Sequence, residues 1–168
     1  LVSSGSANLI FQVYRRGDMT LCPTNLACDL TIAPMMRFST DTAGVRGNAN
    51  SGDPAISNNG SMVAFASSAT NLIGGGVDTN GVDDVFVKME PTGGGSLGAI
   101  VRASVATGGG QSDGHSGGVQ AERTVSLSGY GLQVVYRSAA TILLAGNAPN
   151  TTIDGNGLTD CFASEVIW

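Results

Sequence analysis

The sequence is poor in charged residues, in aromatic residues and in histidine. Charged residues make up 12% of the 168 positions, aromatic residues make up 5%, and histidine occurs once. The net charge of −5 argues against nucleic acid and anionic membranes as partners, because both repel an acidic protein. No apolar run approaches the roughly 18–20 residues that cross a bilayer as a helix, so no membrane span is expected.

Catalytic constellations are also missing from the sequence. We find no paired carboxylates, no Ser-His-Asp order, no zinc-binding cluster and no phosphate-binding glycine loop. His115, the only histidine, is followed by Ser116, but side chains that are adjacent in sequence rarely have the geometry of a base and its nucleophile. We therefore expect a non-enzymatic protein in which His115 is a structural polar residue of a turn.

Glycine, by contrast, is abundant, with 25 of 168 residues. Together with the low charge and many Ser, Thr and Asn residues, this composition is typical of turn-rich, all-β secreted proteins. We expect an extracellular, cell-surface or periplasmic location. Because the chain starts at Leu1 without a methionine or a signal peptide, we expect the numbering to begin after processing or inside a longer gene product.

The chain contains an internal repeat, and a repeat of this kind decides the fold class. VAFASSAT at residues 63–70 aligns with VVYRSAAT at residues 134–141. The pattern D-x-N-G-x-x-D occurs at residues 78–84 and again at residues 154–160. Upstream of these segments, Asn50-Ser51-Gly52 aligns with His115-Ser116-Gly117.

A third, partial copy opens the chain. Residues 4–10 align with residues 67–73, and residues 11–15 then take the place of residues 85–89. The D-x-N-G loop is missing from this copy. The connections at residues 40–53 and 106–118 are expected to be equivalent to each other. Before these connections, MMRFS at residues 35–39 aligns with IVRAS at residues 100–104.

The central copy predicts four short strands, near residues 54–57, 62–67, 84–89 and 99–105. These runs are short, β-branched or aromatic, and separated by Gly, Asn, Asp and Pro, which favours strands over helices. Asn59-Gly60 is expected to supply the positive-φ residues of a tight hairpin turn between the first two strands. The sequence thus predicts a four-stranded antiparallel meander repeated in tandem.

The repeat unit resembles the TolB-type, PD40/WD40-like β-propeller repeat of bacterial secreted proteins. Residues 56–87 carry the resemblance, with the sequence VAFASSATNL followed by DTNGVDDVFV. The resemblance implies an all-β fold of tandem four-stranded antiparallel blades. A single domain would hold about two and a half blades. We expect a partial blade at 1–39, a full blade at 44–105 and a partial blade at 108–168.

Two and a half blades are fewer than the about four to eight that a closed propeller needs. Open sheet edges are templates for pairing with another chain. We therefore expect either further blades of a longer chain or other copies of the same chain as partners. Assembly of copies would give an oligomer or a fibre.

The two D-x-N-G-x-x-D loops are candidate calcium sites. Calcium binds carboxylate, amide and backbone oxygens, although the glycine at the fourth position of each loop excludes an EF-hand. In an alternative that needs no metal, Asn-Gly makes the turn and the last Asp accepts hydrogen bonds from the loop. Calcium is the only cofactor expected. The candidate ligands are Asp78, Asn80 and Asp84 in the first loop and Asp154, Asn156 and Asp160 in the second.

The three cysteines are expected to play different roles. Cys22 and Cys28 lie in one loop, and a disulfide would pin a loop without secondary structure, as in many secreted proteins. A zinc half-site is the alternative, but it would need two more ligands, and only His115 and Cys161 are on offer, in unrelated places. Cys161 takes the place of Val85 in a core strand, so we expect a buried free thiol, with intermolecular pairing as the alternative.

Two sequons fit N-linked glycosylation, at Asn59 and at Asn150. Asn59 is expected to be engaged in its hairpin turn. Asn150 lies in a long predicted loop and is therefore the better acceptor.

Three functions remain open from the sequence. The first is a non-enzymatic extracellular structural or interaction module that assembles through incomplete terminal blades. The second is a piece of a larger propeller hydrolase, for which Asp53, Asp113, Glu122 and Arg123 are the charged candidates near the blade connections. The third is a calcium-stabilised domain that binds a glycan or a protein.

Overall fold

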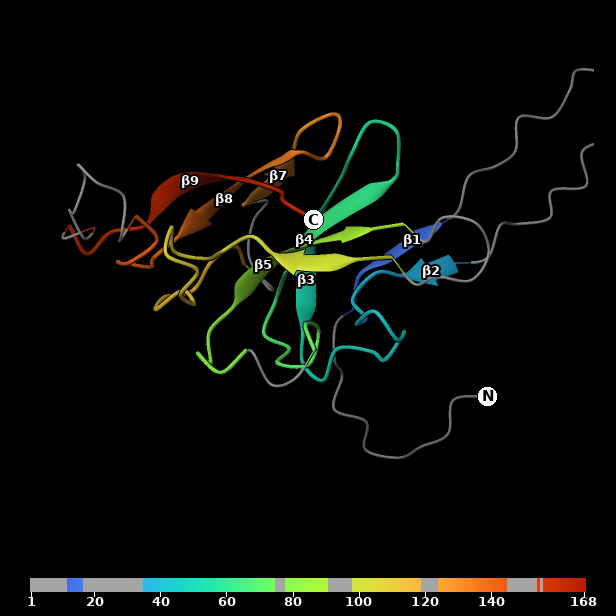
Figure 1. Ribbon diagram of the computed structural model, residues 1–168, viewed down its shortest axis with the longest axis horizontal. Helices are drawn as coiled ribbons and strands as arrows, with labels where there is room; N and C mark the ends of the chain where they lie inside the picture. Colours follow the sequence, from blue (N-terminus) through green and yellow to red (C-terminus); the bar gives the residue numbers. More distant parts are fainter. Residues whose placement is uncertain are drawn as a thin grey trace, which may run out of the picture.

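The computed structural model describes residues 12–16, 35–74, 78–90, 98–118, 124–144, 154 and 156–168. Within these ranges the chain forms nine β-strands and no helix (Figure 1). Accordingly, this part of the chain contains no helix that is long and apolar enough to cross a membrane. The strands form three antiparallel sheets, called here the N-terminal, the central and the C-terminal sheet. The predicted all-β class is confirmed.

The N-terminal sheet is a pair of strands, β1 (Tyr14–Arg16) and β2 (Met35–Arg37). Beside this pair, Phe38 N donates a hydrogen bond to Val13 O at 2.8 Å. Val13 and Phe38 are both buried and pack against residues of the central sheet. The pair is thus held to the rest of the molecule by apolar contacts.

The central sheet is a four-stranded meander. Its strands follow one another in sequence order, and each pairs antiparallel with the next. Branched and aromatic side chains favour this arrangement because they pack well on a pleated surface. The four-stranded antiparallel unit predicted for the central copy is therefore confirmed. The strands are β3 (Ser51–Ile56), β4 (Met62–Ser67), β5 (Asp84–Met89) and β6 (Ile100–Arg102).

The C-terminal sheet has three strands, β7 (Val125–Leu127), β8 (Gln133–Ser138) and β9 (Asp160–Glu165), again in sequence order. Side chains in β8 alternate strictly between exposed and buried, and Val134 and Tyr136 point into the core. The opposite face of this sheet is solvent-exposed. We call it the open face; it carries Val135, Cys161 and Ala163.

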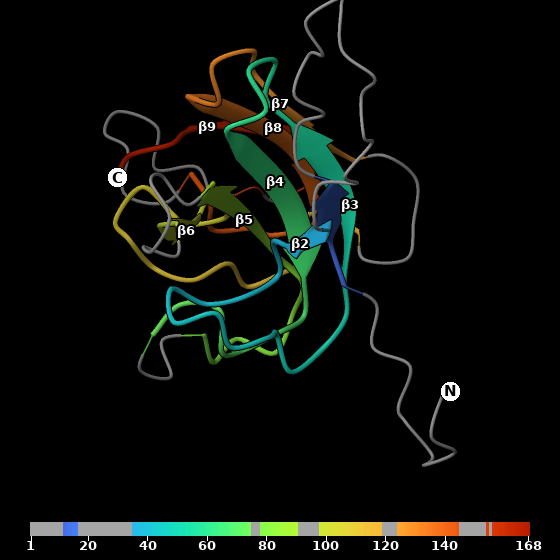
Figure 2. The same ribbon diagram turned by 90° about the vertical axis from the view of Figure 1, so that its right-hand side faces the viewer.

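The three sheets stack face to face in sequence order. In Figure 1 the central sheet lies between β1 and β2 on one side and β7, β8 and β9 on the other, and Figure 2 views the stack from the side of β2. Val63 and Phe65 of β4 pack with Val13 toward the N-terminal sheet, whereas Ala64 packs with Tyr136 toward the C-terminal sheet. Fully burying an aromatic side chain such as Phe65 contributes roughly 1.5–3 kcal/mol. The strands β4 and β5 of the central sheet are thus more completely buried than β8 and β9 of the C-terminal sheet.

A bulge at Asp53 ties the central sheet to the C-terminal sheet. Strand pairing shifts between Gly52 and Ala55, and Asp53 has a φ of 51°, the only positive φ among the described non-glycine residues. A left-handed backbone costs a residue with a Cβ roughly 1–2 kcal/mol. The Asp53 carboxylate offsets this cost, because it accepts hydrogen bonds from Thr124 N at 2.8 Å and from the Thr124 hydroxyl.

The two hairpin turns, at residues 57–62 and 128–133, have the same geometry. Gly60 and Gly131 have φ values of 70° and 75°. The expected positive φ at Asn59 is wrong, because the turn needs only its glycine in that conformation. Asn59 Oδ1 instead accepts hydrogen bonds from Ser57 Oγ at 2.7 Å and from Ser61 N at 3.1 Å. The expectation that Asn59 is engaged in its turn is confirmed.

The register of the N-terminal copy differs by two residues from the alignment made on the sequence. Val13 N donates to Ser39 Oγ at 3.1 Å, and Val85 N donates to Ser104 Oγ at 3.0 Å. Val13, and not Phe11, therefore takes the place of Val85. The alignment was misled because the first copy lacks the loop motif that would have fixed its register.

Candidate functional site

The two D-x-N-G-x-x-D loops share one set of internal hydrogen bonds. Asn80 Nδ2 donates to Asp84 Oδ2 at 2.9 Å, and Asn156 Nδ2 donates to Asp160 Oδ2 at 2.9 Å. Each asparagine Oδ1 also accepts a hydrogen bond from the backbone N–H two residues later, at 3.3 and 2.6 Å. The glycine after each asparagine has a positive φ, 72° in the first loop and 65° in the second. The repeat seen in the sequence is therefore a repeat of side-chain geometry.

An arginine lies between the two carboxylates of the first loop. Arg102 Nη1 is 3.0 Å from Asp84 Oδ2 and 3.3 Å from Asp78 Oδ1, and all three side chains are at most 5% exposed. The other oxygen of Asp84 accepts a hydrogen bond from Ser104 Oγ at 2.5 Å. The arginine and the serine come from β6 and its end, so this cluster joins the loop to the fourth strand of the central sheet.

Burial of this cluster shifts the pKa of Asp78. Its pKa is raised, first because burial disfavours the charged form and then because the Asp84 carboxylate is close. Arg102 opposes both effects. Asp78 and Asp84 thus share one guanidinium in a buried site.

Calcium in these loops stays a prediction. In the first loop an ion between Asp78 and Asp84 would have to displace Arg102. In the second loop, the described residues form no ion pair to Asp154 or Asp160. Over the described ranges, no group of three or more His, Cys, Asp or Glu residues is arranged to hold a metal. The second loop therefore offers the more accessible oxygen ligands.

His115 belongs to the turn scaffold. Its Nδ1 accepts a hydrogen bond from Asp83 N at 3.0 Å and lies 3.4 Å from Asp83 Oδ2, and the histidine side chain is 64% exposed. Ser116 Oγ lies 2.8 Å from Ser138 Oγ and 3.2 Å from Ser112 Oγ. The serine hydroxyl is thus engaged with other serines.

The alignment of Asn50 with His115 is confirmed by the backbone. His115 O accepts a hydrogen bond from Ala139 N at 2.9 Å, and Asn50 O accepts one from Ser68 N at 2.9 Å. The same backbone contact therefore recurs one repeat later. A histidine and an asparagine fill one structural position.

The charged candidates for a hydrolase are also engaged in loop contacts. Asp113 accepts hydrogen bonds from Thr141 N at 2.8 Å and from Thr141 Oγ1 at 2.5 Å. Burial alone would raise the pKa of Asp113, but these hydrogen bonds and one from Ile142 N lower it overall. Asp53 holds the bulge described above. Glu122 and Arg123 lie outside the described residues.

The thiol of Cys161 is exposed and free, so the expected buried thiol is wrong. Cys161 does take the place of Val85, since both pair with β-strand neighbours in the same register. Val85 is covered by the C-terminal sheet, whereas Cys161 lies on the open face. The candidates Cys22, Cys28 and Asn150 lie outside the described residues.

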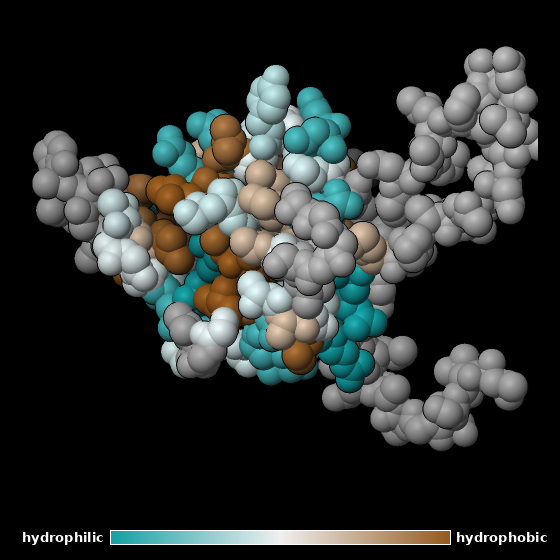
Figure 3. Space-filling view, turned by 45° about the vertical axis from the view of Figure 1, so that its right-hand side comes forward, coloured by the Kyte–Doolittle hydropathy of each residue, from teal (hydrophilic) through white to brown (hydrophobic). Residues whose placement is uncertain are grey.

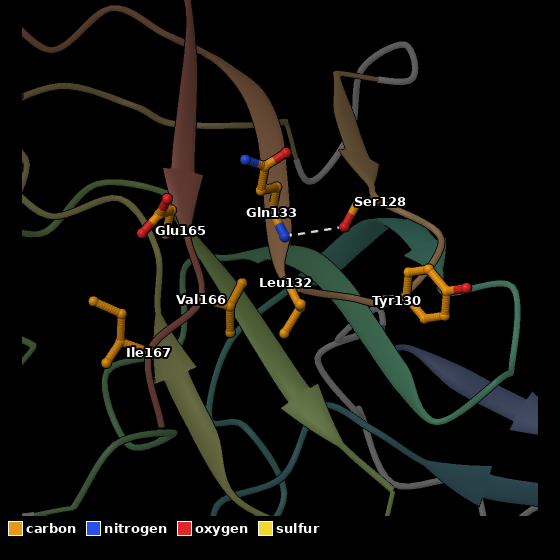
Figure 4. A pocket seen from close by; sticks show the side chains of 7 residues that line it. All are labelled: Ser128, Tyr130, Leu132, Gln133, Glu165, Val166 and Ile167. Atoms are coloured by element: carbon orange, nitrogen blue, oxygen red, sulfur yellow. Dashed lines mark hydrogen bonds between the residues drawn. The ribbon is translucent and has the colours of Figure 1, made fainter.

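A groove that was not predicted from the sequence lies beside the open face. Its volume is about 510 Å³, and it lies where the turn at residues 128–133 meets the end of β9. Figure 4 shows Leu132 and Val166 between Tyr130 and Ile167. Tyr130, Leu132 and Ile167 are 80%, 55% and 78% exposed. The alignment of the repeats does not predict that three apolar side chains at one end of a sheet are exposed.

On the side that Figure 3 views, hydrophobic residues form a patch with hydrophilic residues around it. A gathered apolar surface marks a contact site more often than isolated apolar residues do. Val135, at 46% exposed, extends the apolar surface of the groove along β8. The groove and the open face are therefore the candidate functional site.

Comparison of the chain with protein-family models, with curated proteins and with solved structures finds no match.

Proposed function

We propose that the chain is a non-enzymatic extracellular structural and interaction module, built of propeller-type blades and located at the cell surface or in the periplasm. Antiparallel sheets that stack face to face in sequence order support this proposal, because a propeller is assembled in this way. The recurring hydrogen bonds of turns and loops support it further. The module acts by binding further sheets of its own kind.

The observation that carries the proposal is the open face. Ala64 and Val85 of the central sheet are completely buried, because the C-terminal sheet covers them. The residues at the same positions one repeat later are Val135 and Cys161, and both are exposed. A face that is core in one repeat and bare in the next is suited to being covered by another sheet.

The polar side chains support a role without catalysis. Asp84 and Asp113 each hold a loop by several hydrogen bonds, and His115 holds one by the bond that its Nδ1 accepts from Asp83 N. Asp53 joins two sheets through Thr124. These groups serve the stacking of repeats, which is the activity that we propose.

Light scattering over a range of concentrations, with electron microscopy of the same samples, tests the proposal. We expect particles of several times the chain mass of 16.9 kDa, in the form of rings or fibres. Val135→Asp is expected to reduce their mass, since it places a charge on the open face. Val45→Asp, at a site that is 54% exposed in the connection before β3, is the matched control.

A monodisperse particle of 16.9 kDa with full β content at every concentration would refute self-association. Equal effects of Val135→Asp and Val45→Asp would show that assembly does not use the open face.

A further inference from the structure

The contact between the central and the C-terminal sheet shows how one repeat packs against the next. Asn58 N donates a hydrogen bond to Gly129 O at 2.9 Å, so the turn at residues 128–133 lies against the turn at residues 57–62. Gly131 sits close to Met62, and a Cβ on Gly131 would be 2.2 Å from Met62 Sδ. Leu127, which precedes the turn, packs against the core between the sheets. A hairpin turn with a leucine before it therefore fills the end of the preceding sheet.

One repeat later, the corresponding space is the groove. Gln133 takes the place of Met62, and Glu165 takes the place of Met89, because the two pairs occupy the same register in their sheets. No described segment fills this space, and about 510 Å³ stay open between Leu132 and Ile167. By the repeat, the groove is shaped for a hairpin turn that is preceded by a large aliphatic residue.

The chain carries a second turn of this type, with its aliphatic residue uncovered. In the turn at residues 57–62, Gly60 N donates to Ser57 O at 2.9 Å, and in the turn at residues 128–133, Gly131 N donates to Ser128 O at 2.8 Å. Ile56 stands at the position of Leu127, since each pairs with the first buried valine of its hairpin. Ile56 is 51% exposed.

The two uncovered surfaces belong to different sheets and face different ways. Ile56 pairs with Val63, which faces the N-terminal sheet, whereas the residues that line the groove all belong to the C-terminal sheet and its ends. One copy therefore cannot bring its own Ile56 to its own groove, whereas a second copy can. A contact between two different surfaces of like chains is heterologous, and it continues into a ring or a filament.

We propose that the groove binds a second copy of this chain, which inserts Ile56 and the turn at residues 57–62. The inference rests on the proposed function and names the surface that covers the open face. The contact is apolar at its centre, so the negative charge of both copies is kept at its rim.

Capping variants test the proposal by light scattering. Leu132→Arg blocks the groove, and Ile56→Arg blocks the inserted turn; both sites are more than half exposed, so each variant is expected to fold. Leu158→Arg, at a site that is 68% exposed in the loop before β9, is the control and is expected to assemble like the wild type. Each capping variant alone is expected to stay at the chain mass of 16.9 kDa.

A mixture of the two capping variants is the decisive sample. The Ile56→Arg copy keeps an intact groove, and the Leu132→Arg copy keeps an intact turn, so one good contact remains per pair. We expect a particle of twice the chain mass and nothing larger. Far-UV circular dichroism of each variant checks that the β structure is retained.

The alternative outcomes separate the two proposals. A wild type that is monomeric at every concentration overturns the proposed function itself. A wild type that assembles, with Leu132→Arg disruptive and Ile56→Arg without effect, leaves the open face as a contact but overturns Ile56 as its occupant. Two disruptive variants whose mixture stays monomeric show that the groove does not receive the turn of a second copy, which overturns the head-to-tail arrangement.

Discussion

At the scale of single residues, burial decides how the few charged groups behave. Lys88 is 2% exposed, and its Nζ donates to Thr40 O at 2.7 Å, to Asp41 O at 2.9 Å and to the Thr40 hydroxyl. Burial lowers the pKa of Lys88 to about 8, with the Asp41 carboxylate opposing the shift. This lysine anchors the connection that leads to β3, at the cost of placing a charge in the core.

The lowered pKa of Lys88 predicts that stability rises with pH. Between pH 8 and the ordinary lysine pKa, the folded chain binds fewer protons than the unfolded chain, so the free energy of unfolding increases through this window. The slope is at most about 1.4 kcal/mol per pH unit. Urea unfolding from pH 7 to 10 measures it, and Lys88→Met is the control because it removes the titrating group. A difference between wild type and variant that does not change with pH would contradict the prediction.

The hydroxyl of Tyr136 is a second buried polar group with a defined role. It donates to Ala103 O at 3.2 Å and lies 3.1 Å from Ser164 Oγ. Tyr136→Phe is expected to lower the free energy of unfolding by about 1 kcal/mol, since a buried hydrogen bond is lost. The matched change is Tyr130→Phe, at a residue that is 80% exposed, and it is expected to cost less than about 0.5 kcal/mol. Denaturant unfolding compares the two, and equal losses would argue against the buried hydrogen bond.

At the scale of elements, the sequence predicted the strands better than their surroundings. The runs at β4 and β8 were found because their β-branched and aromatic residues and an internal repeat agree there. The register of β1 was missed, because Gln12 stands where the other copies have the loop aspartate: its Oε1 accepts from Ser39 Oγ at 2.8 Å. The exposure of Cys161 was missed for another reason. Alignment predicts which face a residue occupies, but not whether a further sheet covers that face.

The turn at residues 128–133 has a prediction of its own. Gly131 and Gly109 both have positive φ, 75° and 82°, but only Gly131 faces Met62, while a Cβ on Gly109 meets nothing within 4 Å. Alanine at either position lowers the free energy of unfolding by roughly 1 kcal/mol, because its Cβ disfavours the left-handed backbone. We expect Gly131→Ala to cost at least about 1 kcal/mol more than Gly109→Ala, because Met62 must move. Thermal unfolding of both variants measures the difference, and similar melting temperatures would refute close contact between the turns.

The calcium prediction can be tested because the two D-x-N-G-x-x-D loops differ: among the described residues, an arginine lies between the carboxylates of the first loop only. If calcium stabilises the fold, chelation lowers the melting temperature, since a ligand of the folded state is removed. Asp154→Asn is then expected to abolish the response, because the second loop needs no arginine to be displaced. Asp78→Asn is the matched change in the first loop and is expected to leave the response intact. If a chelator does not change the melting temperature, calcium does not stabilise this protein.

At the scale of the whole molecule, assembly and stability are linked. Folded chains associate and unfolded chains do not, so association raises the free energy of unfolding, and the gain grows with protein concentration. At a partner concentration one hundred times the dissociation constant, the gain is about 2.7 kcal/mol. For a chain of this size, each kcal/mol raises the melting temperature by about 2–4 °C. We expect the melting temperature of the wild type to rise by several degrees between dilute and concentrated samples, and that of Leu132→Arg to stay constant. Scanning calorimetry at both concentrations measures this. If the wild-type particles grow with concentration but the melting temperature stays constant, the contact forms without stabilising the sheets. The open face would then not be a surface that association buries.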